Sequence, residues 1–338
     1  MTRDTPSPPP RALGATGLRV SPIGLGLAAL GRPGYINLGH ADDLGGDRSV
    51  AALRARAFEV LDAAWDAGVR AFDAARSYGR GEVFLGDWLE QRAIAPAEVA
   101  ISSKWGYTYT ADWQVEAETH EVKEHSLSVL RRQWVETREH LGAHLDLYQV
   151  HSVTPESPAL GDPRLLRALA SLKTRGVHVG LSTSGPEQAT TIARALALEV
   201  DGVRLYESVQ VTWNLLERGA GAALAEARSA GMGVIVKEAL ANGRLTSRND
   251  DPAFAEQRAL LALQAERLGT SVDALALAGV LAQPWADMVL SGASTAEQLR
   301  SNLQALDVAW DEEAASRLAP LAETPEDYWQ RRSALPWN

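Results

Sequence analysis

The stretch LDLYQVHSVTPESPALGDPRLLRALASLKTRGVHVGLST, residues 145–183, contains the unit from which the fold of the whole chain can be predicted. Apolar runs at 145–151 and 177–183 flank a segment, 162–175, whose apolar residues recur with a spacing near that of an α-helix. This pattern predicts a strand, a helix and a second strand. Because both runs are rich in β-branched residues and almost continuously apolar, we expect parallel strands that are covered on both faces.

The same alternation continues through the rest of the chain. Further strands are predicted at 23–27, 69–73, 98–104, 203–210, 232–237 and 287–291. Further helices are predicted at 50–67, 81–93, 120–141, 187–198, 215–230 and 252–282. A strand followed by a helix, repeated about eight times, predicts an α/β fold of the (β/α)8 TIM-barrel type. A doubly wound parallel sheet is the structural alternative.

Three segments stand outside this repeat. Residues 1–10 are rich in Pro and Ser and are expected to form a flexible N-terminal arm. The segment RALGATGLRVSPIGLGL, residues 11–27, predicts a β-hairpin before the first strand. The polar, Gly-rich stretch 31–47 predicts an extended loop on the C-terminal face of the barrel. Because no Pro/Gly/Ser-rich linker divides residues 11–338, they are predicted to form a single barrel domain with a C-terminal tail.

Composition and charge exclude several classes of protein. The 338 residues are 46% hydrophobic and 22% charged, as in ordinary globular proteins. The formal charge of −10 argues against a nucleic-acid partner, which would require clustered Lys and Arg. The absence of cysteine excludes disulfides, Cys-ligated metals and thiol nucleophiles. Neither a signal-peptide core nor a membrane-spanning apolar run is visible, so we expect a cytoplasmic protein with no membrane partner.

One dinucleotide-binding fingerprint is misleading. GLGLAA, residues 24–29, follows a predicted strand and superficially fits the motif of Rossmann folds. That motif requires a helix to begin at its third small residue, so that the pyrophosphate lies at the helix N-terminus. Here GRPG follows at residues 31–34, which breaks a helix instead of starting one. We therefore reject a Rossmann fold.

Polar side chains end three of the predicted strands. Asp73 ends AFD, Lys104 ends ISSK and His151 ends YQVH, while Tyr78 lies five residues after Asp73. A polar residue at one strand end can simply mark where the chain meets water. In a TIM barrel, however, all C-terminal strand ends meet at one mouth, where catalytic residues lie. We therefore expect these four side chains to lie together.

These residue types suit proton transfer to a substrate oxygen. A free tyrosine has a pKa near 10, and a neighbouring Lys104 ammonium is expected to lower the pKa of Tyr78. Asp73 would hold Lys104 in place, and His151 would orient a carbonyl group. No metal ligands or paired carboxylates for hydrolysis accompany them. Reduction of a carbonyl needs a hydride, which only a cofactor can supply.

On these residues the sequence resembles the aldo-keto reductase family over about residues 11–310. The opening hairpin, FDAARSYGRGEVFLG (72–86), VAISSKWG (99–106) and LDLYQVH (145–151) are similar to segments of that family, with Ala74 where Thr or Ser is usual. The resemblance implies that Asp73, Tyr78, Lys104 and His151 form the catalytic tetrad, with Tyr78 as general acid.

The resemblance also implies a set of cofactor-binding residues. Lys237 stands where a ring-stacking aromatic is expected, and Arg248 occupies a position where some relatives have a cofactor-facing Lys. On Arg248 we expect NADP(H) in preference to NAD(H), since a 2′-phosphate is usually held by a basic group. The implied cofactor-binding residues are Gly26, Ser182, Thr183, Gln210, Lys237, Leu240, Asn242, Gly243, Arg248, Gly292, Ala293, Ser294, Thr295, Gln298 and Asn302.

Aromatic residues of the long loops are the candidates for substrate contact. We expect Tyr35, Trp105 and Trp113 to line the pocket. HEVKEH, residues 120–125, is interpreted as an exposed helix start, and no metal site is expected.

The function implied is NAD(P)(H)-dependent reduction of an aldehyde or ketone to an alcohol by hydride transfer. The alternatives are a sugar or secondary-alcohol dehydrogenase, which would use the same residues in reverse, and a cofactor-binding regulatory subunit with little turnover. The sequence leaves the substrate, the physiological direction and the oligomeric state open.

Overall fold

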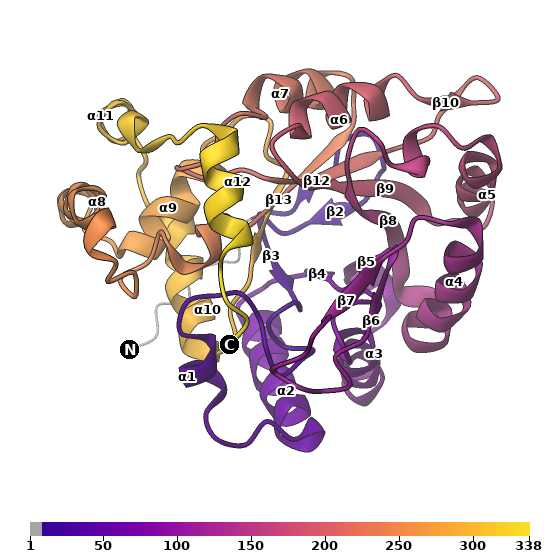
Figure 1. Cartoon of the computed structure of the whole chain (residues 1–338), viewed down its shortest axis with the longest axis horizontal. Coiled ribbons are helices and arrows are strands. Elements are labelled where there is room, and N and C mark those ends of the chain that lie inside the picture. The colour runs from indigo at the N-terminus through magenta and orange to yellow at the C-terminus, as the bar shows by residue number, and fades with distance from the viewer. Residues whose placement is uncertain (1–8) are drawn as a thin grey trace.

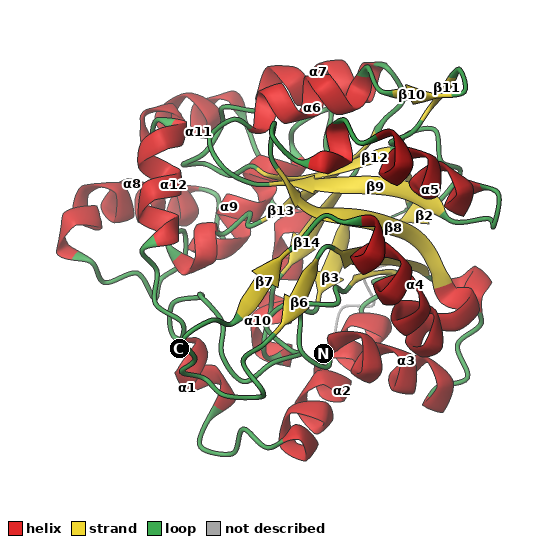
Figure 2. Cartoon of the chain, turned by 45° about the vertical axis from the view of Figure 1, so that its right-hand side comes forward, coloured by secondary structure: helices red, strands yellow, loops and turns green. Residues whose placement is uncertain are grey.

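The structure, a computed structural model, describes residues 9–338, so most of the predicted arm at residues 1–10 lies outside the described residues. Within the described part of the chain, parallel strands close into a barrel in the order β12-β13-β14-β3-β4-β5-β8-β9. Helices surround this barrel on the outside (Figures 1 and 2). The predicted (β/α)8 barrel is confirmed, and the doubly wound alternative is wrong.

The barrel strands lie close to the predicted apolar runs, except that the run 203–210 contains a short strand outside the barrel at 203–204 and only the start of β12. They are β3 (Ile23–Gly26), β4 (Ala71–Asp73), β5 (Ala100–Trp105), β8 (Leu145–Val153), β9 (His178–Thr183), β12 (Ser208–Thr212), β13 (Gly233–Lys237) and β14 (Met288–Ser291). Nearly every residue in them is buried. This is expected of parallel strands that pack against side chains inside the barrel and against helices outside.

The covering helices begin at polar capping residues. Ser49, Ser126 and Ser271 each accept a hydrogen bond from a backbone N–H in the first turn of the helix that follows. The helices around the barrel are α2 (Val50–Asp66), α3 (Gly81–Gln91), α4 (Leu127–Leu141), α5 (Pro163–Lys173), α6 (Gln188–Leu196), α7 (Gly221–Ser229), α8 (Ala255–Arg267), α9 (Val272–Leu281) and α10 (Ala296–Leu303).

Three of the predicted helices differ from the structure. The helix predicted at 215–230 begins only at Gly221, in α7. Residues 120–141 do not form one helix, because β7 (Glu121–Lys123) pairs in antiparallel fashion with β6 (Tyr107–Tyr109), and α4 begins only after its cap at Ser126. Residues 252–282 are divided into α8 and α9 at Gly269, whose φ of 64° ends the first helix.

The N-terminal hairpin closes the bottom of the barrel. β1 (Arg11–Ala12) pairs with β2 (Arg19–Val20), as predicted. Leu13 beside this hairpin packs with Val20, Ile235 and Met288 in an apolar cluster inside the barrel. Because this end is filled, a cavity can open only at the opposite, C-terminal end of the strands.

Additional elements lie over that open end. They are α1 (His40–Leu44), β6, β7 and the C-terminal helix α12 (Pro325–Ser333), while α11 (Glu312–Arg317) and the pair β10 (Glu199–Val200) and β11 (Val203–Arg204) lie elsewhere. Figure 1 shows α12 crossing toward the barrel and the C-terminus ending close to α1. The last residue is tied there, because the side chain of Asn338 accepts a hydrogen bond of 2.9 Å from the backbone N–H of Ala41.

We predict that Gly86→Ala destabilises the fold. A Cβ at Gly86 would lie 2.2 Å from the carbonyl oxygen of His140, so α3 and α4 would have to move apart. We expect a loss of about 1–3 kcal/mol in the free energy of unfolding, measured by urea denaturation. Gly46→Ala is the control, since a Cβ there meets no atom within 4 Å. Equal stability of the two variants would contradict the close helix contact.

Candidate active site

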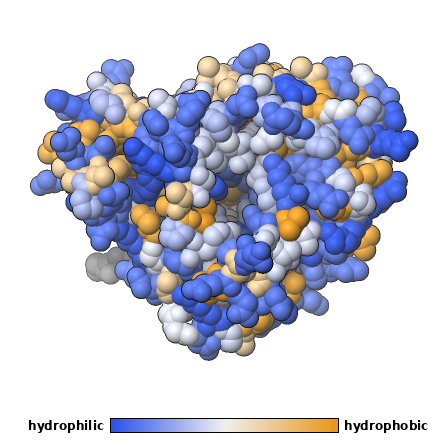
Figure 3. Space-filling view, in the orientation of Figure 1, coloured by the Kyte–Doolittle hydropathy of each residue, from blue (hydrophilic) through white to orange (hydrophobic). Residues whose placement is uncertain are grey.

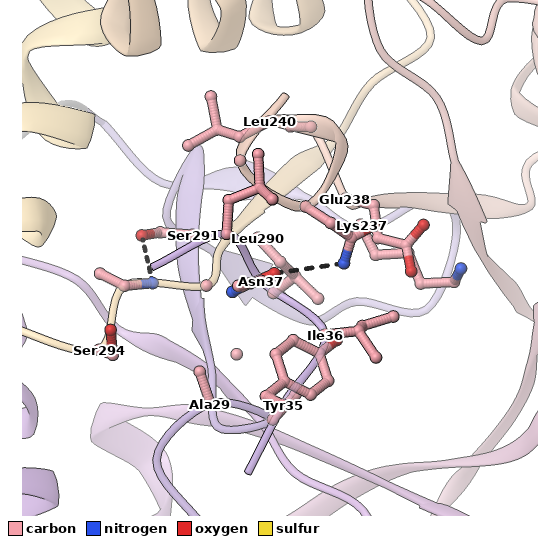
Figure 4. Close-up of a pocket in the computed structure, with 18 of the residues that line it drawn as sticks. Ala29, Tyr35, Ile36, Asn37, Lys237, Glu238, Leu240, Leu290, Ser291 and Ser294 are labelled. Carbon is pink, nitrogen blue, oxygen red and sulfur yellow. Dashed lines mark hydrogen bonds between the residues drawn. The ribbon is translucent and has the colours of Figure 1, made fainter. Parts of the chain in front are cut away.

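A cavity of about 730 Å³ opens at the C-terminal ends of the barrel strands. Its walls come from the loop after β3, the segment after β13, the turn between β14 and α10, and the C-terminal tail. Figure 3 shows this face hollowed near its centre, and Figure 4 shows Tyr35 and Asn37 across from Lys237 and Leu240. One elongated site is therefore assembled from segments far apart in the sequence.

The structure brings the four predicted catalytic residues together at one end of this cavity. Lys104 forms an ion pair with Asp73 and donates a second hydrogen bond, of 2.9 Å, to the carbonyl oxygen of Ala74. The Lys104 ammonium lies 4.7 Å from the centre of the Tyr78 ring. The His151 ring meets the Tyr78 ring edge to face at 5.6 Å between centres. Asp73, Tyr78 and His151 line the cavity, whereas Lys104 lies buried behind them.

Three neutral donors complete the surroundings of Asp73. Its Oδ1 accepts hydrogen bonds from Ser102 at 2.6 Å, Gln149 at 3.2 Å and Gln210 at 3.0 Å. Buried carboxylates need such donors, because burial removes the water that would otherwise solvate them. Gln210, an expected cofactor contact, thus lines the cavity while it also holds Asp73.

Burial keeps Tyr78 protonated. It raises the pKa of Tyr78 well above the ordinary value, Asp73 raises it further, and Arg32 lowers it in part. The net direction is opposite to the predicted effect of Lys104. The reason is that burial, the largest cause, and the Asp73 carboxylate both raise the pKa. A phenol that holds its proton can act as a donor.

His151 is neutral near pH 7. Burial lowers the pKa of His151 well below its ordinary value, and the nearby cations Lys104, Lys237 and Arg32 lower it further. Burial likewise lowers the pKa of Lys104, although Asp73 raises it in part. A neutral imidazole can still donate one N–H to a substrate oxygen. It therefore suits an orienting role beside the proton donor.

Arg32 is a site residue that the sequence did not reveal. Its guanidinium is buried, donates to the carbonyl oxygen of Ser77 and forms an ion pair of 3.1 Å with Glu121. It lies 5.3 Å from the centre of the Tyr78 ring and 4.7 Å from that of Trp337. Nothing marked it, because the stretch 31–47 looked like a polar loop and Glu121 was predicted to lie in a helix.

Lys237 belongs to a second cluster of charged side chains, together with Glu238 and Arg332. Lys237 lines the cavity and donates a hydrogen bond of 2.5 Å to Thr212. Burial lowers its pKa to about 8. Burial alone would raise the pKa of the adjacent Glu238, but Arg332, with which it forms an ion pair of 2.5 Å, and Lys237 lower it to about 2. Lys237 is therefore held in a charged wall, not in a ring-stacking position like an aromatic.

Most of the predicted cofactor-binding residues line the cavity. They are Gly26, Gln210, Lys237, Leu240, Asn242, Gly243, Arg248, Gly292, Ala293, Ser294, Thr295, Gln298 and Asn302. Ser182 and Thr183 do not. Ser182 accepts a hydrogen bond of 2.8 Å from the backbone N–H of Ser152, and Thr183 donates one of 2.9 Å to Gln188.

Of the three predicted substrate contacts, only Tyr35 lines the cavity. Trp105 is fully buried in β5 and packs against the His125 ring, so it belongs to the core. Trp113 donates to the carbonyl oxygen of Arg48 and packs on Phe84. Trp337, an aromatic residue of the C-terminal tail, reaches the cavity because this tail returns over the barrel mouth.

The interpretation of HEVKEH as an exposed helix start is also wrong. Its residues 121–123 form β7, and its two histidines are separated. His120 stacks on Trp337, while His125 is buried between Ser157 and the carbonyl oxygen of His151. Among residues 9–338, no cluster of three or more His, Cys, Asp or Glu side chains has the arrangement of a metal site.

Comparison with known families identifies the family of the chain. The model of the "Aldo/keto reductase family" matches residues 22–323. The chain belongs to the aldo/keto reductase family. Members of this family are oxidoreductases that act on small carbonyl substrates. In the part of the chain that the structure describes, no helix has the length and hydropathy required to cross a membrane.

Named relatives of this family cover almost the same length. An uncharacterized oxidoreductase, YrpG, of Bacillus subtilis (strain 168) is 29% identical over 94% of this chain and 98% of its own. An L-glyceraldehyde 3-phosphate reductase of Escherichia coli (strain K12) is 26% identical over 88% of this chain and 87% of its own. The fold matches that of the aldo-keto reductase AKR11C1 from Bacillus halodurans in its holo form, with a TM-score of 0.70, 22% identity, and coverage of 94% of this chain and 97% of that one.

The arrangement around Asp73 predicts unequal costs for breaking the ion pair. In Lys104→Met, Asp73 keeps its three neutral donors. In Asp73→Asn, the buried ammonium of Lys104 keeps only the Ala74 carbonyl as a full acceptor. We expect Asp73→Asn to cost about 3–5 kcal/mol in the free energy of unfolding and Lys104→Met to cost less, measured by urea denaturation at pH 7.

The free energy of unfolding of these variants is also expected to depend on pH. The folded pKa of Lys104 is already below its unfolded value, and loss of Asp73 lowers it further. Between these two values the unfolded chain binds more protons, so stability rises with pH. The rise between the folded pKa and about pH 10.5 should be larger in Asp73→Asn than in the wild type. A flat profile in the variant would contradict the lowered pKa of buried Lys104.

Proposed function

We propose that the protein interconverts aldehydes or ketones and alcohols by hydride transfer with a nicotinamide dinucleotide. The observation that carries this proposal is the placement of Tyr78. Its phenol faces the cavity, makes no hydrogen bond within residues 9–338, and lies between the Lys104–Asp73 pair and neutral His151. A protonated phenol beside a neutral imidazole suits donation of a proton to a carbonyl oxygen.

The remainder of the cavity fits an elongated dinucleotide. The Oδ1 atom of Asn242 is buried in the wall and has no hydrogen-bond partner among the described residues. Gly292 leaves the backbone open, since a Cβ there would meet no atom within 4 Å, and the N-terminus of α10 follows directly. A helix N-terminus favours an anionic group such as pyrophosphate. We therefore propose that the cavity-lining set of predicted residues, without Ser182 and Thr183, holds the cofactor.

The bound nicotinamide would supply the hydride, and the side chains would supply the protons and the orientation. Tyr78 donates its proton to the carbonyl oxygen during reduction and takes it back during oxidation. Lys104, held by Asp73, faces the Tyr78 ring and stabilises the phenolate left behind. His151 donates a hydrogen bond that orients the carbonyl oxygen. The same groups serve both directions.

The substrate end of the cavity combines aromatic and cationic groups. Tyr35 and Trp337 provide apolar faces, whereas Arg32 and Lys237 provide positive charge. We propose a small carbonyl compound with an apolar face as the substrate. Positive charge near the reacting oxygen also stabilises the alkoxide that develops there.

The choice between NADP(H) and NAD(H) depends on Arg248. The expected preference for NADP(H) requires that its guanidinium be available to a 2′-phosphate. In the structure this group forms an ion pair of 2.6 Å with Asp43.

Tyr78→Phe tests the proton donor. The variant keeps the ring and its contacts but loses the proton, so we expect the rate of carbonyl reduction to fall about 10²–10⁴-fold while cofactor affinity changes little. Turnover is measured by nicotinamide absorbance on a panel of aldehydes, ketones and sugars, and affinity by fluorescence titration. Full activity in the variant would remove Tyr78 from its role. Tight binding without turnover in the wild type would favour a regulatory subunit.

A further inference from the structure

The far end of the cavity is organised around one buried carboxylate, that of Asp43 in α1. Its Oδ1 forms the ion pair of 2.6 Å with Arg248. Its Oδ2 accepts hydrogen bonds from Gln298 at 2.7 Å and from Ser294 at 2.9 Å. The Asp43 side chain is only 8% exposed. α1, the segment after β13 and the turn before α10 are thus joined through a single acidic group.

Asp43 is charged in this arrangement. Burial alone would raise the pKa of Asp43, but the donors Arg248, Gln298 and Ser294 together lower it below its ordinary value. The pKa of Arg248 is raised, chiefly by its hydrogen bond to Asp43. A second donor of Arg248 lies 3.3 Å from the carbonyl oxygen of Gly39. The guanidinium is therefore already bound by acceptors of the protein itself.

The surrounding wall is acidic. Among the described residues that line this end, Arg248 is the cation, and the carboxylates are Asp42, Asp43, Asp273 and Glu297. The other cations that line the cavity, Arg32, Lys237 and Arg332, belong to the opposite end, near Tyr78 and Glu238. The electrostatic potential beside Asp43 is consequently unfavourable for a 2′-phosphate in addition to the pyrophosphate that the N-terminus of α10 would hold.

The orientation of the cofactor follows from the proposed function, on which this inference rests. Hydride transfer requires the nicotinamide near Tyr78 and His151. The adenosine half must then extend along the cavity toward α10 and Asp43. A ribose hydroxyl can donate a hydrogen bond to a carboxylate, whereas a 2′-phosphate in the same place would bring like charges together.

We infer that Asp43 makes this protein prefer NAD(H) over NADP(H). The Asp43 carboxylate already binds the donors of Arg248, Gln298 and Ser294, which would otherwise be available to a 2′-phosphate. It also offers a hydrogen-bond acceptor to the ribose 2′-hydroxyl. Binding of NADPH through Arg248 would bring the 2′-phosphate next to the Asp43 carboxylate. The preference expected from Arg248 alone is therefore reversed, because its charge is neutralised by a residue more than 200 positions earlier in the chain.

Equilibrium binding tests this inference without turnover. The full-length protein is titrated with NADH and with NADPH at about 0.1 M ionic strength, and quenching of protein fluorescence gives both Kd values. We expect NADH to bind at least about tenfold more tightly than NADPH. In Asp43→Asn, which keeps the size of the side chain and frees Arg248, we expect NADPH to bind about tenfold more tightly than to the wild type, and NADH to weaken only a few-fold.

Asp47→Asn is the matched control. It removes one carboxylate from the same loop, but Asp47 is exposed and its side chain accepts a hydrogen bond from the backbone of Ser49, not from the cavity wall. The ratio of the two affinities should stay at its wild-type value. Thermal denaturation of each variant, with and without dinucleotide, checks that the fold is intact.

The possible outcomes are distinct. Equal or tighter binding of NADPH by the wild type would overturn this inference and leave the proposed function standing. An unchanged affinity ratio in a folded Asp43→Asn variant would also overturn it, because Asp43 would then not face the 2′ position. Failure of the wild type to bind either dinucleotide would overturn the proposed function and this inference with it.

Discussion

The buried ion pair between Lys104 and Asp73 is the constraint on which the site depends. Taking two charges out of water is costly unless each finds its partner and further hydrogen bonds. The barrel meets this requirement by closure, because β4, β5, β8 and β12 each contribute to the group around Asp73. Asp73, Lys104 and His151 are thereby held by strands, whereas Tyr78 lies in the loop after β4. Tyr78 then lies against a fixed, electrically balanced pair.

The two ends of the cavity differ in the charge of the side chains that line them. Near Tyr78 the walls carry Arg32, Lys237 and Arg332, each beside a carboxylate or a hydroxyl group. At the far end the balance is acidic, and Asp43 organises the contacts. Because electrostatic interactions strengthen in a partly dehydrated site, we propose that these opposed ends discriminate between the two halves of a dinucleotide and between dinucleotides that differ by one phosphate.

The strands and the polar residues that follow them were open to prediction because they are local. Each of Asp73, Lys104 and His151 ends an apolar run, so its place follows from the strand that precedes it. The predictions that failed concern contacts between segments that are far apart in the sequence. Trp105 and Trp113 are aromatic and close to Lys104 in sequence, yet one faces the core and the other packs on Phe84. Arg32 and Trp337 carried no periodic signal, although both line the cavity.

By itself, the sequence determined the barrel, its strands and the polar residues at their ends, since hydrophobic periodicity specifies which residues are buried together along one segment. Only the tertiary structure decided how that chemistry is tuned. It placed Asp73 against Lys104 so that burial governs the pKa of Tyr78, and it paired Asp43 with Arg248 across the cavity. The physical reason is that the charge felt by a group depends on distance in space, which spacing along the chain does not encode.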